Sequence, residues 1–161
     1  MPEKEIKFKE KFIERYSRLT DFKTFKKYSL TYLRRSIRVN TLKISVEKLK
    51  KRLEKNWILT PVPWCKQGFW IEHKGIGEEK RRDVGNLIEH TLGYIYIQEA
   101  ASMIPPIVLD PKPGEIILDM CASPGSKASQ IAQYMQNKGV FIANDYKGER
   151  MKPLGINIQR M

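Results

Sequence analysis

Apolar residues in the N-terminal half recur every three or four positions in three stretches, 5–19, 21–30 and 46–56. This spacing predicts amphipathic helices with one apolar face. The Thr20–Asp21 pair precedes the second stretch and Ser45 precedes the third, and short polar residues of this kind cap helix N-termini. The N-terminal half is therefore expected to contain at least three helices.

Two other stretches of this half have the character of β-structure. Residues 36–44 read SIRVNTLKI, with β-branched residues that favour a strand. Residues 57–71 are rich in Trp, Phe, Val and Ile but are interrupted by Pro61, Pro63 and Gly68, which predicts two short strands around turns. Together with the helices they predict a small α+β unit.

The spacing of apolar residues changes after the charged segment 75–85, GIGEEKRRDVG. This segment is expected to be a linker. Short apolar runs then alternate with helical spacing, a rhythm typical of a parallel, doubly wound α/β sheet. The proline pair Pro105–Pro106 is expected to stop the first helix. The predicted domains are 1–85 and 86–161. The predicted elements of the second domain are strands at 92–98, 115–121 and 139–145 and helices at 99–109, 126–138 and 147–161.

Charge separates the two halves further. The net charge is +12, and residues 1–60 hold 18 Lys and Arg against 7 Asp and Glu, whereas residues 61–161 hold 12 against 11. Phosphate backbones are the usual partners of such a basic surface. A solvated helix face or an acidic membrane surface would use the same residues, so charge alone leaves these alternatives open.

Several classes of protein are not expected from this composition. No apolar run approaches the length needed to cross a bilayer, and the start, MPEKEIKFKE, is charged rather than signal-like. A cytoplasmic protein is the expectation. Cys65 and Cys121 are too few for a disulfide framework or a thiolate zinc site, and His73 and His90 lack metal-ligand spacing. No metal site is expected.

The richest chemistry lies in LDMCASPGSKASQ, residues 118–130, directly after a predicted strand. In doubly wound sheets, ligands bind outside the carboxyl ends of the strands, where the loop enters the next helix. Pro124 and Gly125 allow a sharp turn, and a helix beginning near Ser126 presents its positive end. An anionic group, carboxylate or phosphate, is the expected ligand.

Two phosphate-binding patterns do not fit this loop. The P-loop needs an earlier glycine and a hydroxyl directly after the lysine, and the dinucleotide pattern G-x-G-x-x-G is absent. Asp145 nevertheless ends the next predicted strand twenty residues after Gly125, the spacing at which an acid binds ribose hydroxyls. A ribonucleoside without pyrophosphate, such as S-adenosylmethionine, fits both features. A nucleotide-dependent oxidoreductase remains an alternative on the strand and acid spacing alone.

DMCASPGSKASQIAQ resembles the first cofactor motif of the RNA cytosine-5 methyltransferases of the Nop/Sun family, usually D-x-C-A-A-P-G-G-K-[TS]. YIQEAASMIPP is similar to the strand and helix that precede the family's core. GVFIANDYKGERMKPLGINIQRM resembles its second strand and following helix, with the pattern D-x-x-x-x-R-x-x-x-L-x-x-N-x-x-R. RVNTLK, residues 38–43, resembles a signature of its N-terminal RNA-binding region. These matches run in order from about residue 36 to residue 161.

The resemblance implies a fold, a cofactor and a substrate. The fold is α/β, an incomplete Rossmann-like methyltransferase core preceded by a small basic α+β RNA-binding domain. The cofactor is S-adenosylmethionine and the substrate is tRNA or rRNA. The implied cofactor-binding residues are Cys121, Ala122, Ser123, Pro124, Gly125, Ser126 and Lys127 around the methionine part, Asp145 on the ribose hydroxyls and Arg150 in support. The predicted RNA-binding residues are Arg34, Arg35, Arg38 and Lys43.

Two positions depart from the family pattern. Ser126 replaces the usual second glycine and Ala128 the usual hydroxyl. If the first of these positions has φ > 0, serine costs about 1 kcal/mol there, because its Cβ crowds the backbone. The cofactor site would then be weakened without being abolished.

The catalytic cysteines implied by the resemblance are missing. Carbon 5 of cytosine is a poor nucleophile, so a thiolate adds to carbon 6 before methylation. In the family this thiolate and a second cysteine lie in motifs D-x-P-C-S and T-C-S, which this sequence lacks. Cys121 matches the motif-one cysteine that lines the cofactor pocket, and Cys65 belongs to the N-terminal unit. No catalytic residue is therefore assigned in this chain.

A methyltransferase sheet of this kind has about seven strands, and only the first few are predicted here. Pro153 and Gly155 also weaken the expected final helix. The chain is thus expected to be a fragment or one piece of a split enzyme, inactive alone and completed by a downstream polypeptide. A non-catalytic RNA-binding protein, or a pseudoenzyme with a partial cofactor fold, is the alternative.

Overall fold

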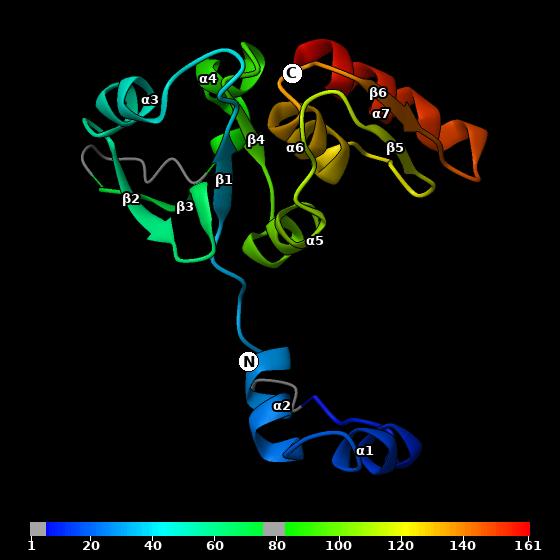
Figure 1. Cartoon of the computed structure of the whole chain (residues 1–161). Helices are drawn as coiled ribbons and strands as arrows, with labels where there is room; N and C mark the ends of the chain where they lie inside the picture. The colour runs from blue at the N-terminus through cyan, green and yellow to red at the C-terminus, as the bar shows by residue number, and fades with distance from the viewer. Residues whose placement is uncertain (1–5, 76–82) are drawn as a thin grey trace. The chain divides into compact units, whose positions relative to one another are not determined.

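The computed structural model describes residues 6–75 and 83–161 of the chain (Figure 1). The chain divides into two compact units, one ending at Leu33 and the other spanning Arg34–Met161. Both β-sheets belong to the larger unit. No helix in the described ranges has the length and apolar character needed to cross a membrane.

The smaller unit is a pair of helices, α1 (Glu10–Ser17) and α2 (Phe22–Ser29). The first is shorter than the predicted 5–19, and residue 5 lies outside the described residues. The Asp21 carboxylate accepts a hydrogen bond from the Thr24 amide at 2.8 Å, which confirms the predicted cap. Aromatic rings pack between the two helices. They are Phe8, Phe12, Tyr16, Phe22 and Phe25.

The larger unit contains an antiparallel sheet with the strand order β2-β3-β1-β4. Helix α3 (Val46–Leu53) packs on it through buried Leu49 and Leu53. The predicted Ser45 cap is confirmed, since its hydroxyl accepts from the Lys48 amide at 3.3 Å. The strands are β1 (Ser36–Val39), β2 (Trp57–Val62), β3 (Cys65–His73) and β4 (Ile95–Ile97).

A second sheet, with two strands, lies in the C-terminal part of the chain. Strands β5 (Ile116–Asp119) and β6 (Val140–Ala143) are parallel, with Asp119 opposite Ala143. Helix α6 (Ser126–Tyr134) connects them and α7 (Gly148–Arg160) follows β6 (Figure 1). The predicted strand, helix, strand, helix order is confirmed. Helix α7 runs without a break through Pro153.

Strand β4 belongs to a different sheet from the one expected. It was predicted within the second domain, just before the core strands, but its backbone pairs with β1 of the antiparallel sheet, with Ile37 opposite Ile97. Val84, in a short 3-10 helix (Val84–Asn86), also packs into the core of the antiparallel sheet, and α4 (Ile88–Thr91) follows it. Arg34–Met161 forms one compact unit. The predicted domain division at residue 85 stays a prediction.

The proline pair also acts differently from the prediction. A 3-10 helix (Ala100–Met103) leads directly into α5 (Ile104–Leu109), and Pro105 and Pro106 lie in the first turn of α5. The first-turn amides of a helix have no partner within it, so a missing N–H costs nothing there. The prolines therefore begin a helix rather than end one.

Candidate functional site

The loop between β5 and α6 turns sharply at Gly125, which has φ of +107° and is the N-cap of α6. Its amide donates to the Ala122 carbonyl at 2.7 Å. A Cβ at this position would lie 3.4 Å from atoms of Asn157 and Leu154 on α7. The backbone conformation therefore favours glycine, whereas the space around it would bring a Cβ only into ordinary van der Waals contact.

Side chains from β4 and α7 anchor this loop. The Pro124 carbonyl accepts from the Tyr96 hydroxyl at 3.3 Å and from Asn157 Nδ2 at 2.8 Å. The Ser123 hydroxyl donates to the Arg150 carbonyl at 2.7 Å, and Arg150 Nη2 donates to the Ser123 carbonyl at 2.9 Å. Burial raises the pKa of Tyr96 above its usual range, against the opposing effect of nearby arginines, which keeps its hydroxyl protonated as a donor.

Asp145 lies two residues beyond β6, at the same sheet edge as the loop. Its carboxylate is buried and accepts from the Ser123 amide at 3.3 Å and the Lys147 amide at 3.4 Å. Arg150 Nη1 lies 3.4 Å from the same carboxylate. The structure thus brings the predicted loop, the predicted acid and Arg150 together, because the carboxyl ends of parallel strands share one edge.

The loop residues differ in exposure. Ala122, Ser123 and Gly125 are buried, whereas Cys121, Pro124 and Lys127 are exposed and Ser126 is half-buried. Ser126 is the first residue of α6 and is not among the residues with positive φ. The conditional penalty expected for serine there therefore does not arise, since Gly125 takes the left-handed conformation.

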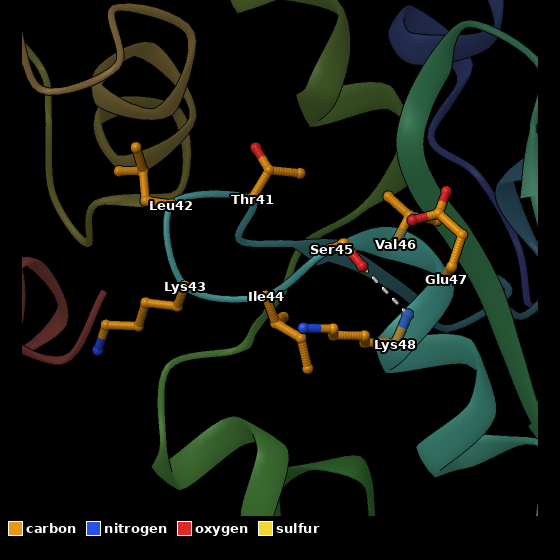
Figure 2. Close-up of a pocket in the computed structure, with 8 residues that line it drawn as sticks. All are labelled: Thr41, Leu42, Lys43, Ile44, Ser45, Val46, Glu47 and Lys48. Carbon is orange, nitrogen blue, oxygen red and sulfur yellow. Dashed lines mark hydrogen bonds between the residues drawn. The ribbon is translucent and has the colours of Figure 1, made fainter.

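The predicted RNA-binding residues do not share one environment. Arg34 and Arg35 are exposed, and the Arg34 guanidinium lies 4.5 Å from the centre of the Trp70 ring. Lys43 is exposed and extends toward the C-terminal segment, where its Nζ donates to the Arg160 carbonyl at 2.7 Å (Figure 2). The RNA contacts of these three residues stay predictions.

Arg38 requires a correction. Its side chain is 0% exposed, so its guanidinium has no access to an RNA phosphate. The residue lies on β1 of the antiparallel sheet and its side chain reaches α6; Gln98 and Ser129 accept its hydrogen bonds at 3.0 and 2.7 Å. The resemblance of RVNTLK to an RNA-binding signature predicted an RNA contact for Arg38, but β1 is buried along its whole length and its Arg38 side chain lies inside.

The surface hollow next to this signature is lined by residues 41–48 (Figure 2). They form the turn after β1 and the first residues of α3. The Ser45 hydroxyl is already used to cap α3 through the Lys48 amide. The other polar side chains of the hollow are those of Thr41 and Lys43 in the turn and of Glu47 and Lys48 in the first turn of α3.

Sequence reasoning missed Tyr96, Gln98 and Gln133, which help to hold Arg38 and the loop. Tyr96 and Gln98 lie in YIQEAASMIPP and Gln133 ends DMCASPGSKASQIAQ. The motifs assigned no role to these side chains, because their roles depend on contacts between segments that are distant in the sequence. Among the described residues, no group of three or more metal-ligating side chains comes together. Cys65 is buried and Cys121 exposed, and both are free thiols.

Comparisons with known proteins agree with this geometry. Residues 8–100 match the N-terminal domain of 16S rRNA methyltransferase RsmF, and residues 106–161 match 16S rRNA methyltransferase RsmB/F. The chain is 50% identical over 155 residues to tRNA (cytosine(49)-C(5))-methyltransferase of Pyrococcus abyssi, which covers 96% of this chain and 48% of the relative. It is 53% identical over 133 residues to ribosomal RNA small subunit methyltransferase F of Photobacterium profundum, covering 81% and 27%.

Solved structures show the same fold. A methyltransferase homolog protein from Pyrococcus horikoshii is 38% identical with a TM-score of 0.76, covering 95% of this chain and 53% of that one. NSun6 from Pyrococcus horikoshii, solved with SFG, has a TM-score of 0.82 at 22% identity, covering 95% and 62%. The predicted fold class and family resemblance are confirmed. The chain belongs to the RsmB/F (Nop/Sun) family of RNA cytosine-5 methyltransferases and spans about half the length, or less, of the curated relatives it matches.

Proposed function

We propose that this chain supplies the RNA-binding and cofactor-binding parts of an S-adenosylmethionine-dependent methyltransferase acting on cytosine in tRNA or rRNA. One observation carries the proposal. The loop 121–127 and Asp145 lie together at the carboxyl ends of β5 and β6, in a chain similar to a tRNA cytosine-5 methyltransferase. A ligand at this edge would contact both groups at once.

The donors and acceptors at this edge fit the cofactor. The first-turn amides of α6, from Ser126 to Ala128, have no partner within the helix and suit a carboxylate. The Asp145 carboxylate suits ribose hydroxyls, because its two oxygens offer about four acceptor sites and each accepts one backbone amide, from Ser123 and Lys147. When bound, S-adenosylmethionine would supply the methyl group, while these residues bind and orient it.

We further propose that the chain alone does not transfer a methyl group. Cys65 is buried between the antiparallel sheet and the helical segment 100–109, beside Val62 and Met103, and Cys121 belongs to the loop 121–127. Neither stands in a D-x-P-C-S or T-C-S motif. A polypeptide segment that carries those motifs would provide the nucleophile for carbon 6 of cytosine.

The apolar surface of the parallel pair supports the same view. Ile116 and Leu118 on β5 are 76% and 56% exposed, and Val140 and Ile142 on β6 are each 50% exposed. Contiguous exposed apolar residues on a sheet mark a surface that another element covers. We propose that the segment with the catalytic cysteines packs here and completes the sheet.

Titration calorimetry with S-adenosylmethionine tests the cofactor role. Asp145→Asn keeps the size of the side chain but removes its charge, and we expect its affinity to fall by about tenfold, the effect of losing hydrogen bonds to a charged acceptor. Asp110→Asn is the control, because Asp110 is exposed and pairs with Lys112 away from this edge. Equal affinities for the two variants would overturn the proposed role of Asp145.

An assay of methyl transfer to tRNA tests whether the catalytic cysteines come from a segment outside this chain. The chain alone should give no product, and adding a segment with the two cysteine motifs should give product. Substantial methylation by the chain alone would contradict the proposal. If the chain binds RNA with a steep salt dependence but never binds S-adenosylmethionine, the non-catalytic RNA-binding alternative is correct.

A further inference from the structure

The buried guanidinium of Arg38 forms a hydrogen-bonded link in the centre of the larger unit. Its side chain is fully buried, and its three nitrogens point to separate partners. Nε donates to Gln98 Oε1 at 3.0 Å, Nη1 donates to Gln133 Oε1, and Nη2 donates to Ser129 Oγ at 2.7 Å. Arginine suits this place because its planar fork offers several fixed donors at once.

These partners belong to two different layers. Gln98 directly follows β4 in the antiparallel sheet, whereas Ser129 and Gln133 lie on α6. The antiparallel sheet and α6 therefore share one buried guanidinium. Removing it would leave several buried acceptors without a donor, which is more costly than losing an exposed contact.

The link extends to the first turn of α6, next to the cofactor loop. Arg38 Nη2 lies 3.5 Å from the Ser126 carbonyl, and the Ser129 hydroxyl donates to that carbonyl at 3.2 Å. Ser126 follows Gly125 directly, and Tyr96 on β4 holds the Pro124 carbonyl from the same sheet. The loop is thus held from the antiparallel sheet at two neighbouring points.

The charge of Arg38 has no acid among these partners. In the part of the chain that the structure describes, its hydrogen-bond acceptors are two amides, a hydroxyl and a backbone carbonyl. Burial lowers its pKa to about 10, so the guanidinium remains charged at neutral pH. A buried positive charge beside the N-terminal turn of α6 adds to the positive end of the helix and favours an anionic group at the loop.

Other residues of RVNTLK contact the end of α7. Asn40 Nδ2 donates to the carbonyls of Gly93 and Met161 at 3.0 and 2.6 Å, and Lys43 Nζ donates to the Arg160 carbonyl. The signature therefore joins the antiparallel sheet to both helices that flank the predicted cofactor edge.

We propose that Arg38 is a positioning residue for the cofactor loop 121–127. At this one position, RVNTLK serves cofactor binding rather than RNA contact. The proposal rests on the function proposed above for the loop. It means that a residue of the antiparallel sheet fixes the position of the first turn of α6. RNA affinity should not depend on Arg38, since the side chain has no access to solvent.

Hydrogen exchange on the full chain without cofactor tests the positioning directly. In Arg38→Lys, which keeps the charge but loses the fork, we expect the amides of Ser123 and Gly125 to exchange about tenfold faster, since hydrogen bonds to a charged group are lost. The amides of β3 should keep their protection. Calorimetry should show about tenfold weaker binding of S-adenosylmethionine and unchanged binding of tRNA.

Two further variants keep the test decisive if Arg38→Lys folds poorly. Ser129→Ala removes one acceptor on α6 and leaves Arg38 in place, and it should show the same local effect at smaller size. Arg15→Lys is the matched control, because Arg15 is exposed on α1, and it should change neither exchange nor cofactor binding. The proposal would be overturned if Arg38→Lys and Ser129→Ala both left the exchange of the loop amides unchanged. It would also be overturned if the amides of β3 became faster by the same factor as those of the loop. If the parent chain binds no S-adenosylmethionine, the proposed cofactor function fails, whereas the exchange data still decide the positioning role.

Discussion

The two sheets of the larger unit differ in how completely they bury their apolar residues. The antiparallel sheet encloses a core with α3 in which Ile37, Leu49 and Ile95 are fully buried. The parallel pair leaves Ile116 and Leu118 of β5 more than half exposed. One sheet is thus a closed packing unit, while the other has an ordered polar edge and an uncovered apolar surface. The difference teaches that side-chain hydrogen bonds from β4 and α7 hold the loop after β5, although the parallel pair leaves apolar residues exposed.

The largest effect should come from the closed core. Leu49→Ala should lower the free energy of unfolding by about 3 kcal/mol, because it leaves a cavity among fully buried side chains. Leu118→Ala on β5 should change it by no more than about 0.5 kcal/mol, since the parent side chain is already exposed. Urea denaturation of both variants measures the contrast. Equal losses would mean that the two sheets do not differ in packing.

The next effect concerns the polar edge of the parallel pair. Gly125→Ala should cost about 1 to 2 kcal/mol, because its φ of +107° is unfavourable for any Cβ, and should also weaken binding of S-adenosylmethionine. Gly155→Ala is the control, since a Cβ there meets nothing within 4 Å and alanine favours the interior of α7 by about 1 kcal/mol. Thermal melts should therefore shift in opposite directions. A neutral Gly125→Ala would show that the loop tolerates another backbone conformation.

The smallest effect should appear at the contact between α4 and α7. Burial, with a contribution from Arg160, holds the pKa of His90 below its usual value of 6.5. The unfolded chain therefore takes up the proton more readily, and the free energy of unfolding should decrease as the pH falls from about 7.5 to about 5.5. His90→Gln should reduce this slope while keeping an acceptor near Arg160 Nη1. An unchanged slope would assign the pH dependence to other groups.

Local patterns predicted most of the elements. The caps Asp21 and Ser45 were correct, because a cap depends only on the next three residues. The parallel pair β5 and β6 and its connecting helix were correct as well, since apolar runs separated by a helical period leave few alternatives. The motif also placed the loop and Asp145 at one sheet edge, which follows from parallel strands.

Other features depended on contacts between distant residues. β4 joined the antiparallel sheet through pairing with β1, about sixty positions earlier, and no local pattern distinguishes one strand partner from another. The exposure of Ile116 and Leu118 on β5 does not follow from the sequence, since an apolar run looks the same whether or not another element covers it. Arg38 was expected to contact RNA because RVNTLK resembles an RNA-binding signature, but its side chain is buried, where Gln98 after β4 and Ser129 on α6 accept its hydrogen bonds.

The sequence by itself determined the family, the order of the elements and the loop that ends β5, because motif spacing and periodicity are properties of neighbouring residues. Only the tertiary structure decided which strand pairs with which and that Arg38 links the antiparallel sheet to α6. These outcomes arise when backbone and side-chain polar groups from remote segments must satisfy one another in the same buried space.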